Sequence, residues 1–372
     1  MAPEFIPLAV NLSFVGKKPT GLANYALNLI PELPLSGLTL LAPDHFPRLE
    51  QHSYYPIPNT LTPEQGKLGH FRRLAWTQLQ LPKIYKEQQS RLLFSPIPEA
   101  PLRSACRSVV VVHDLIPLRF PNWKSPLTQY ARHYIPQVLE QAEHIICNSI
   151  ATAQDITQFF QIPAQKITPI PLAHNAQHFC ISTTDSLRAR FEIPARGRPY
   201  FFYVGRPDPY KNLHRVIWAL ATLPTDYQLL IAGSRDRRYT PILQAQIQEL
   251  GLTDRVQFLD YVTYDQLPVL YGQAIALVFP SLWEGFGFPV LEAMSCGTPV
   301  ITSNLSSLPE VAGDAAILVN PYDEKAIANA MQQIVMDDEG RSQLRAAGLA
   351  RASQFSWAKT GRATAEVLGR FV

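Results

Sequence analysis

The stretch FPSLWEGFGFPVLEAMSCGTPVI occupies residues 279–301 of a chain of 372 residues. It begins with an apolar segment typical of a buried strand, continues through a glycine-rich loop into a helix-length segment, and ends in a second apolar segment. Pro289 suits the first helical position, and Gly297 suits the left-handed position after a helix end. The pattern therefore predicts a strand, a helix and a second strand, which is the repeating unit of a parallel α/β sheet.

Short β-branched or aromatic segments bounded by proline, glycine, asparagine or serine recur along the whole chain. The predicted strands of the first half are residues 5–10, 38–41, 91–94, 108–112, 144–147 and 166–170. Those of the second half are residues 200–204, 227–231, 255–259, 275–279, 298–301 and 315–319. Helix-length segments separate most of them, and the run VVVV at 109–112 is apolar without alternation, as in a strand buried on both faces. The sequence thus predicts an α/β fold with two doubly wound, Rossmann-like domains.

The stretch with the least pattern is residues 180–199, and we place the domain linker there. The N-terminal domain is expected over residues 1–182 and the C-terminal domain over residues 183–355. Residues 356–372 are predicted to form a last helix that can pack back on the first domain. Ligands of such sheets bind beyond the carboxyl ends of the strands, so we expect the site in a cleft between two facing domains.

Composition excludes several classes of protein. A total of 33 lysines and arginines against 30 acidic residues leaves a net charge of +3, too weak for an electrostatic nucleic-acid binder. We therefore expect no nucleic acid among the partners. No apolar run reaches the roughly 18 residues of a spanning helix, and the N-terminus lacks the basic start of a signal peptide. These two features lead us to expect a cytoplasmic protein. The four cysteines are far apart and include no CxxC pair for zinc or redox chemistry, so we expect reduced thiols.

The glycine-rich loop is the first candidate for chemistry. It leaves free backbone N–H groups at a helix N-terminus, where these groups and the helix dipole favour an anion such as a diphosphate. We expect Glu292 in the first turn of that helix, and a carboxylate beside a phosphate site can accept hydrogen bonds from sugar hydroxyls. The alternative is a loop that only turns the chain. The loop residues concerned are Glu284, Gly285, Phe286, Gly287 and Phe288.

Glu284 and Glu292 form a Glu-x7-Glu pair, and the surrounding sequence strongly resembles the retaining glycosyltransferases of family 4. That family has the GT-B fold, two facing Rossmann-like domains with a cleft between them. The resemblance implies that Glu284 acts in catalysis, holding donor-sugar hydroxyls together with the backbone of the loop. It implies that Glu292 binds the ribose of a nucleotide.

The resemblance continues through FFYVGRPDPYKN, where Gly205, Arg206 and Lys211 match the family's residues that hold the donor diphosphate. Two cations against a diphosphate are physically reasonable, because charge-assisted hydrogen bonds contribute roughly 1.5 to 3 kcal/mol each. As an alternative, Arg206 and Lys211 are surface charges that follow a strand. The stretch around Val262 resembles the segment whose backbone contacts the nucleobase, and Thr263 and Gln266 form a predicted capping box after it.

In the first half, Gly21 resembles the glycine that the family places near the donor phosphate, although the family often has two adjacent glycines there. His113 ends a predicted strand, and the resemblance places it against the donor sugar as a catalytic residue. A structural core histidine is the alternative. Asp114 orients its neighbour or caps the loop. Ser149 lies where relatives contact the acceptor or donor sugar, or it is the N-cap of a helix.

The chain contains no Asp-x-Asp motif, through which metal-dependent glycosyltransferases of the other major fold bind diphosphate. We therefore expect no metal requirement, and no cofactor either, because the nucleotide sugar is a substrate. The function expected from the resemblance is retaining transfer of a sugar to an acceptor hydroxyl in glycan, polysaccharide or glycolipid synthesis. No covalent nucleophile is evident, so the resemblance implies front-face return, with the departing phosphate helping to deprotonate the acceptor.

The motifs quoted so far are shared by transferases that use different donors. His113, Asp114 and the segment HFRRLAWTQLQLP resemble mannosyltransferases and favour GDP-mannose. Three alternatives stay open: a UDP-sugar donor, a GT-B-fold epimerase or phosphorylase, and a non-catalytic subunit that binds sugar nucleotides. The expected partners are a nucleotide sugar and a carbohydrate or lipid-linked acceptor. Residues 68–89 are basic and aromatic, which fits either a solvated helix face or peripheral contact with an anionic acceptor or the inner face of a membrane.

Overall fold

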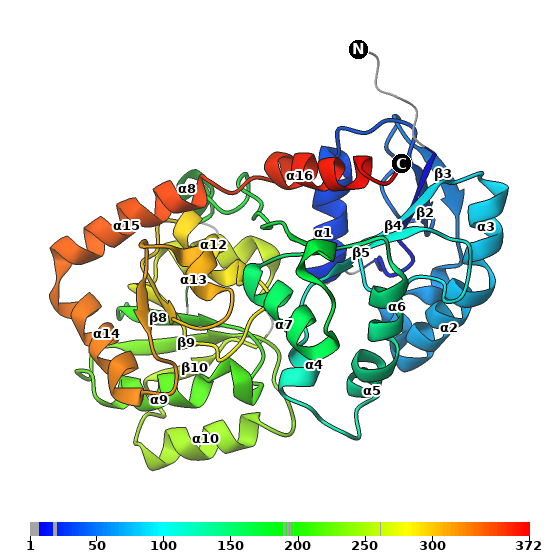
Figure 1. The fold of residues 1–372 in the computed structure, drawn as a ribbon. Helices are drawn as coiled ribbons and strands as arrows, with labels where there is room; N and C mark the ends of the chain where they lie inside the picture. The colour runs from blue at the N-terminus through cyan, green and yellow to red at the C-terminus, as the bar shows by residue number, and fades with distance from the viewer. Residues whose placement is uncertain are drawn as a thin grey trace. The chain divides into compact units, whose positions relative to one another are not determined.

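The computed structural model describes residues 7–17, 21–188, 191, 193, 195, 197–260 and 262–372. The chain forms two compact units (Figure 1). Unit 1 consists of Met1–Leu172 and Trp357–Val372, and unit 2 consists of Ala173–Ser356. Each unit contains one sheet in which every recorded strand pair is parallel, as the apolar strands without alternation predict.

The sheet of unit 1 has seven strands in the order β3-β2-β1-β4-β5-β6-β7. The strands are β1 (Leu8–Asn11), β2 (Thr39–Ala42), β3 (Ser53–Pro56), β4 (Leu92–Ser95), β5 (Ser108–Val112), β6 (His144–Cys147) and β7 (Ile167–Pro169). The helices are α1 (Gly21–Leu29), α2 (Gly66–Leu79), α3 (Leu81–Glu87), α4 (Ile116–Arg119), α5 (Pro126–His133), α6 (Ile135–Gln141), α7 (Ile150–Phe160) and α16 (Trp357–Gly369). The strand β3 is absent from the sequence prediction, which otherwise locates every strand of this sheet within a few residues.

The sheet of unit 2 has six strands in the order β10-β9-β8-β11-β12-β13. The strands are β8 (Tyr200–Val204), β9 (Gln228–Ala232), β10 (Val256–Phe258), β11 (Ala276–Phe279), β12 (Val300–Ser303) and β13 (Ile317–Val319). The helices are α8 (Ile181–Arg188), α9 (Leu213–Ala221), α10 (Thr240–Glu249), α11 (Leu267–Gly272), α12 (Phe288–Ser295), α13 (Leu308–Ala312), α14 (Glu324–Met336) and α15 (Asp338–Ala352). All six predicted strands of this half are present.

The apolar core of each unit lies between its sheet and the helices. In unit 1, Val110 and Val112 of β5 belong to one cluster with Leu81 of α3 and Val138 of α6. The strand β5 is buried along its whole length, since Ser108–Val112 exposes at most a few per cent of any side chain. None of the helices in the described part of the chain combines the length and the hydropathy that a membrane span needs.

The chain leaves unit 1 at residue 172, ten residues before the division expected from sequence. The cause is Phe179, which is buried and packs edge-on against Tyr264 and Tyr271 of unit 2. The neighbouring His178 stacks on Tyr264 with ring centroids 3.9 Å apart. These aromatic contacts hold the polar stretch before α8 on the second unit. Several residues of the linker predicted at 180–199, namely 189, 190, 192, 194 and 196, lie outside the described residues.

The last helix, α16, belongs to unit 1 and packs against α1, which it crosses in Figure 1. Gly361 permits a close approach, because a Cβ there would lie 2.2 Å from the carbonyl oxygen of Glu32. The hydroxyl of Thr360 donates a hydrogen bond to the carbonyl of Pro171 at 2.8 Å. The ring of Trp357 lies 6.1 Å from that of Tyr25. The helix is therefore a packed part of unit 1, as the sequence prediction allowed.

Candidate functional site

The candidate donor site of unit 2 lies where the strand order of its sheet reverses. The strands β8 and β11 are parallel neighbours in the sheet. The strand that follows β8 in the chain, β9, lies on one side of this pair, and the strand that follows β11, β12, lies on the other side. The loops that follow β8 and β11 therefore leave the same edge of the sheet side by side, at the position where open α/β sheets bind ligands. The first loop carries Gly205, Arg206 and Lys211, and the second carries Glu284 through Phe288.

Lys211 and Glu284 meet across these two loops. The ammonium group of Lys211 donates to both carboxylate oxygens of Glu284, at 2.6 and 2.8 Å. Asn212 fixes the two loops together, because its buried side-chain amide donates to the carbonyls of Pro280 and Pro321 at 2.9 and 2.7 Å. Asn212 also has a positive φ of 64°, which ends the short helical turn carrying Lys211. Sequence reasoning found the lysine and the glutamate but missed this asparagine.

Arg206 extends from the same loop into solvent, with 67% of its side chain exposed, and pairs with Asp208 at 2.9 Å. The turn before it is tight. Gly205 has φ +147° and donates its N–H to the carbonyl of Ala232. The neighbouring Gly233 faces it so closely that a Cβ on Gly233 would lie 2.2 Å from the Gly205 carbonyl oxygen. The glycines thus bring the two strand ends together, and Arg206 can reach a ligand at that edge.

Ser307 fixes the loop before α12 by hydrogen bonds to its backbone. Its hydroxyl lies 3.0 Å from the carbonyl of Glu284 and 2.8 Å from that of Phe286. Gly287 has φ +109°, a conformation that other residues rarely adopt, so glycine is favoured at this position. The helix begins at Phe288, one residue earlier than predicted. Pro289 is therefore the second helical residue and not the first. Gly297 has the left-handed conformation predicted for it, with φ +73°.

Glu292 lies in the second turn of α12, not in the first turn as the sequence prediction had it, because the helix starts at Phe288 and holds no acidic residue in its first turn. The buried hydroxyl of Tyr271 donates a hydrogen bond to its carboxylate at 2.9 Å. Burial raises the pKa of Glu292 to about 7, and the bond from Tyr271 opposes that rise. The carboxyl group therefore titrates near neutral pH.

The predicted nucleobase segment is described in part, since Tyr261 lies outside the described residues. Val262 is half-buried and precedes the capping box of Thr263 and Gln266, which is present as predicted. The base contact of Val262 stays a prediction. Among the described residues, no group of three or more histidine, cysteine or acidic side chains is placed to hold a metal ion.

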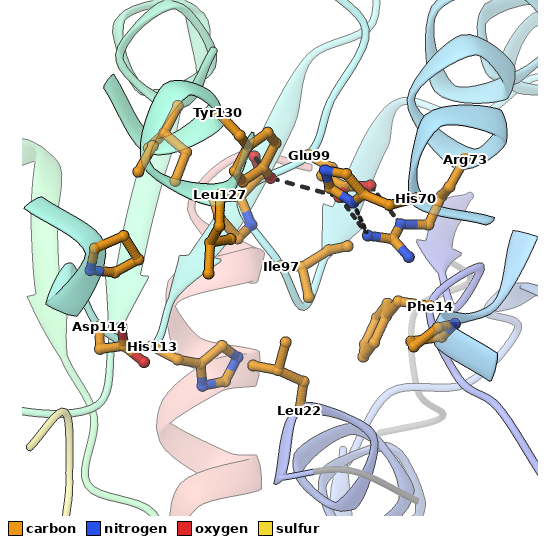
Figure 2. A pocket seen from close by; sticks show the side chains of 15 residues that line it. Phe14, Leu22, His70, Arg73, Ile97, Glu99, His113, Asp114, Leu127 and Tyr130 are labelled. Carbon is orange, nitrogen blue, oxygen red and sulfur yellow. Dashed lines mark hydrogen bonds and ion pairs between the residues drawn. The ribbon is translucent and has the colours of Figure 1, made fainter. Parts of the chain in front are cut away.

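Unit 1 contains a pocket of about 280 Å³ (Figure 2). The strand order of this sheet reverses between β1 and β4, so the pocket lies in the corresponding ligand-binding position of its own sheet. The loop after β1 contributes Phe14, the loop after β4 contributes Ile97 and Glu99, and the residues after β5 contribute His113 and Asp114. Two of the residues that sequence reasoning selected in this half therefore line a real pocket.

The ring of His113 is held in one orientation. Its Nε2 lies 2.9 Å from the carbonyl oxygen of Pro96, and the ring packs edge-on against Tyr25 at 4.7 Å. Because a carbonyl only accepts, Nε2 carries the proton and Nδ1 is an acceptor. Burial lowers the pKa of His113 to about 4, so the ring is neutral at pH 7. Asp114 accepts a hydrogen bond from the backbone N–H of Ile116 at 3.1 Å, as a residue that caps the loop would.

The other two predictions in unit 1 have different outcomes. Gly21 is the first residue of α1 and is exposed, and a Cβ there would meet no described atom within 4 Å. Packing within the described residues therefore does not require a glycine at this position, and the predicted phosphate contact of Gly21 stays a prediction. Ser149 is buried and caps α7, since its hydroxyl accepts a hydrogen bond from the N–H of Thr152 at 3.0 Å. The structure thus shows the capping alternative for Ser149.

Sequence reasoning missed a buried polar cluster at the far side of the pocket from His113. Arg73 donates to both carboxylate oxygens of Glu99 at 2.8 Å, and it donates to Nδ1 of His70 at 2.8 Å. The hydroxyl of Tyr130 donates to the carbonyl of Pro98 and, at 3.4 Å, to Glu99. The available signal was a glutamate directly after a strand, at the edge where ligands bind.

A second missed feature joins the ends of two strands in the sheet of unit 1. The side-chain amide of Asn11 donates to the hydroxyl of Ser95 at 3.3 Å, and the hydroxyl of Ser13 donates to the Asn11 amide oxygen at 2.7 Å. All three side chains are fully buried. They tie the carboxyl ends of β1 and β4 together, which keeps the reversal point of the sheet in one shape.

The model of the glycosyl transferases group 1 matches residues 185–351, and the model of glycosyltransferase family 4 matches residues 19–178. The chain is 30% identical to O-antigen chain mannosyltransferase B of Escherichia coli, over 91% of this chain and 93% of that protein. It is 29% identical to O-antigen chain mannosyltransferase RfbU of Salmonella typhimurium, over 88% and 90%.

Solved structures of low sequence identity share the fold. Sucrose-phosphate synthase from Thermosynechococcus elongatus superimposes with a TM-score of 0.77 at 21% identity, over 98% of both chains. HepE from Anabaena, solved in complex with UDP and glucose, superimposes with a TM-score of 0.73 at 20% identity, over 98% of this chain and 99% of that one. At these identities the likeness establishes the architecture of two Rossmann-like domains.

Proposed function

The chain belongs to glycosyltransferase family 4, and from this premise we propose that it is a retaining mannosyltransferase that uses GDP-mannose to extend an O-antigen-like glycan. That it is a hexosyltransferase with the GT-B fold follows from the family and the architecture. The choice of mannose rests on the two relatives near 30% identity, both O-antigen mannosyltransferases. The retaining course and the GDP donor rest on the resemblance of the Glu-x7-Glu loop and the His113–Asp114 context.

One observation carries the proposal, which is the meeting of Lys211 and Glu284 at the edge of the sheet where strand order reverses. Departure of a nucleoside diphosphate needs its growing negative charge stabilised, and preorganised donors aimed at that charge are usually the largest catalytic term. Lys211, Arg206 and the N–H groups at the start of α12 would supply those donors. Glu284 orients Lys211 before the donor arrives and would then accept hydrogen bonds from the sugar.

Glu292 would hold the ribose hydroxyls, with Tyr271 fixing its carboxylate by the hydrogen bond described above. Its pKa near 7 means that a fraction of the carboxyl groups is protonated at neutral pH. A protonated carboxyl accepts fewer hydrogen bonds from hydroxyls than a carboxylate does. We therefore expect donor affinity to rise as the pH rises from 6 to 8, as Glu292 ionises.

The test is a thermal-shift screen of nucleotide sugars followed by turnover. A ligand at about 100 times its dissociation constant adds about 2.7 kcal/mol to the free energy of unfolding, so binding is readily visible. We expect GDP-mannose to raise the Tm more than UDP-glucose or UDP-N-acetylglucosamine. With mannosylated acceptor glycans, GDP should be released, and NMR of the product should show an α-linkage like that of the donor.

Three results would contradict the proposal. A larger shift with a UDP-sugar would identify another donor. Interconversion of the donor sugar without any acceptor would favour an epimerase. Tight binding of GDP-mannose without GDP release, in the presence of every mannosylated acceptor tried, would favour a non-catalytic binding subunit.

A further inference from the structure

A second pocket, of about 300 Å³, lies in unit 2 at the edge of the sheet opposite the candidate donor site. Its walls include Ala274 and Ile275, which directly precede β11, and Gly297 and Pro299, which precede β12. Because β11 and β12 are parallel, their amino ends meet at one edge, whereas the donor loops follow carboxyl ends. The remaining wall is one face of α15 and consists of Asp338, Arg341, Ser342 and Arg345.

The face of α15 presents two guanidinium groups to this pocket. Arg341 and Arg345 are one helical turn apart, which places them on the same side of the helix. Nη1 of Arg345 donates a hydrogen bond to the carbonyl of Gly297 at 3.0 Å. A Cβ on Gly297 would lie 3.0 Å from the guanidinium carbon of Arg345, so the glycine gives this group room. The guanidinium of Arg345 is thus held against the wall of the pocket.

Most of the N–H groups of the two arginines are left for a ligand. A guanidinium has five N–H donors, and Arg345 uses one of them on Gly297, which leaves four. Arg341 donates to the carbonyl of Ile334 at 2.9 Å and to the carboxylate of Asp338 at 2.5 Å, which leaves three. These bonds fix both side chains before a ligand arrives.

The lining carries a net positive charge. Its charged side chains are two arginines and one aspartate. Arg341 pairs with Asp338, whereas no carboxylate in the described part of the chain lies within ion-pair distance of Arg345. The charge therefore favours an anion, and Arg345 is the cation that the anion would neutralise.

The number and direction of the donors fit a tetrahedral anion. A phosphate group has three or four oxygens that point in different directions, so two guanidinium groups and the exposed hydroxyl of Ser342 can bind it together. A carboxylate has two oxygens in one plane and matches a single guanidinium. The rest of the wall is formed by Ala274, Ile275 and Pro299, and a volume of about 300 Å³ leaves room for a small organic group.

We propose that this pocket binds a phosphate group, either free or carried by a small organic molecule. Arg345 supplies the principal contact, and Arg341 and Ser342 complete the site. The inference goes beyond the proposed glycosyl transfer, because the donor of that reaction would bind at the opposite edge of the sheet. The site belongs to unit 2 alone, since every lining residue lies within that unit.

The experiment measures binding to the intact protein by isothermal titration calorimetry in a phosphate-free buffer of low ionic strength. Excess GDP is present throughout, so that the proposed donor site is filled. The probes are glycerol 3-phosphate and inorganic phosphate, with glycerol and acetate as the uncharged and planar counterparts. We expect the two phosphates to bind and both counterparts to bind at least tenfold more weakly or not at all. Tighter binding of glycerol 3-phosphate identifies an organic phosphate as the ligand, and equal or tighter binding of inorganic phosphate identifies the free ion.

The key variant is Arg345→Met, which removes the charge and should raise the Kd for phosphate at least tenfold. Arg345→Lys keeps the charge without the planar fork and should lie between the variant and the wild type. Lys211→Met, at the candidate donor site, should bind phosphate as the wild type does. The matched control is Arg362→Met, at an exposed arginine of α16, which should change nothing.

A second variant approaches the same site from the opposite direction. Ser342 is exposed on α15, so Ser342→Asp should fold, and its negative charge should repel the anion and raise the Kd at least tenfold. The proposal is overturned if neither phosphate binds the wild type, or if Arg345→Met and Ser342→Asp both bind as the wild type does. Loss of phosphate binding in Lys211→Met but not in Arg345→Met would also overturn it, because the anion would then occupy the donor site. The thermal shift with GDP-mannose tests the proposed function separately.

Discussion

The two units each contain a buried glutamate paired with a basic side chain, and the two pairs differ in what surrounds them. In unit 1, Arg73 also contacts Leu61 and His70, and Glu99 also contacts Tyr130. In unit 2, Lys211 and Glu284 lie on the two loops where the strand order reverses, with 17% and 10% of their side chains exposed against 8% and 2% in unit 1. The Arg73–Glu99 pair is surrounded by other protein groups, as a fixed part of the scaffold would be. The Lys211–Glu284 pair is more exposed, so a ligand could contact it.

The largest expected effect is the loss of stability on removing the charge of Arg73, which tests whether the Arg73–Glu99 pair stabilises the fold of unit 1. Arg73→Met should lower the free energy of unfolding in urea by about 3 to 5 kcal/mol, because it leaves the carboxylate of Glu99 buried without its counter-charge. The exposed neighbour Arg72→Met should stay within about 0.5 kcal/mol of the wild type. Adding Glu99→Gln to Arg73→Met should restore part of the loss. A stable Arg73→Met protein would show that the pair contributes little to the scaffold.

The next effect separates function from stability in unit 2. Lys211→Met should reduce kcat/KM for the donor at least tenfold, which corresponds to about 1.4 kcal/mol. Its unfolding free energy should fall by less than that of Arg73→Met, since Glu284 is more exposed to water than Glu99 is. Lys325→Met, at an exposed lysine of α14, serves as the control and should retain full activity. Wild-type kinetics in Lys211→Met would remove the lysine from the donor site.

A smaller effect concerns the pH dependence of stability through Glu292. Its folded-state pKa of about 7 is above the ordinary value of 4.5, so the fold prefers the protonated form. The wild type therefore loses this part of its stability as the pH rises from about 4.5 to 7. Glu292→Gln cannot ionise, so it does not lose this stability. The Tm of the variant minus that of the wild type should therefore increase across this pH range, by about 2 to 4 °C for each kcal/mol of unfolding free energy that the wild type loses.

The control for that measurement is Glu366→Gln, at an exposed glutamate of α16, whose Tm difference from the wild type should not change with pH. The same Glu292→Gln protein should bind the donor less tightly at pH 8. A Tm difference that is constant from pH 5 to 8 would mean that Glu292 is ionised throughout that range in the folded protein.

The smallest expected effect is that of metal removal on the transfer rate. If Lys211, Arg206 and the start of α12 neutralise the diphosphate, excess EDTA should change the transfer rate by less than about twofold. Activity that is lost in EDTA and restored by magnesium would show that a divalent ion does part of this work. The assay compares initial rates of GDP release with and without chelator at saturating donor.

The fold was predictable where burial is uniform along a strand. The run at Ser108–Val112 is apolar throughout because both faces of β5 are covered. The strand β3 was missed because it is a short edge strand whose residues Ser53 and Pro56 are exposed. Its tyrosines at 54 and 55 alone do not make an apolar run, and a terminal proline is typical of edges.

The candidate site was predictable where its residues are local in sequence. Glu284 and Glu292 share one loop and one helix, so their spacing carries the signal. The cluster of Arg73 and Glu99 joins α2 to the loop after β4 across 26 residues, and no local pattern records that contact. The division of the chain was displaced for a similar reason, because Phe179 packs on Tyr264, far along the sequence.

The return of α16 to unit 1 has a consequence for the order of biosynthesis. A ribosome synthesises the whole of unit 2 between the two segments of unit 1. The surface that Gly361 covers, beside Glu32, is therefore bare while about half of the protein is still being made. Unit 2 can form from one continuous segment, whereas the first unit to begin is the last to be finished.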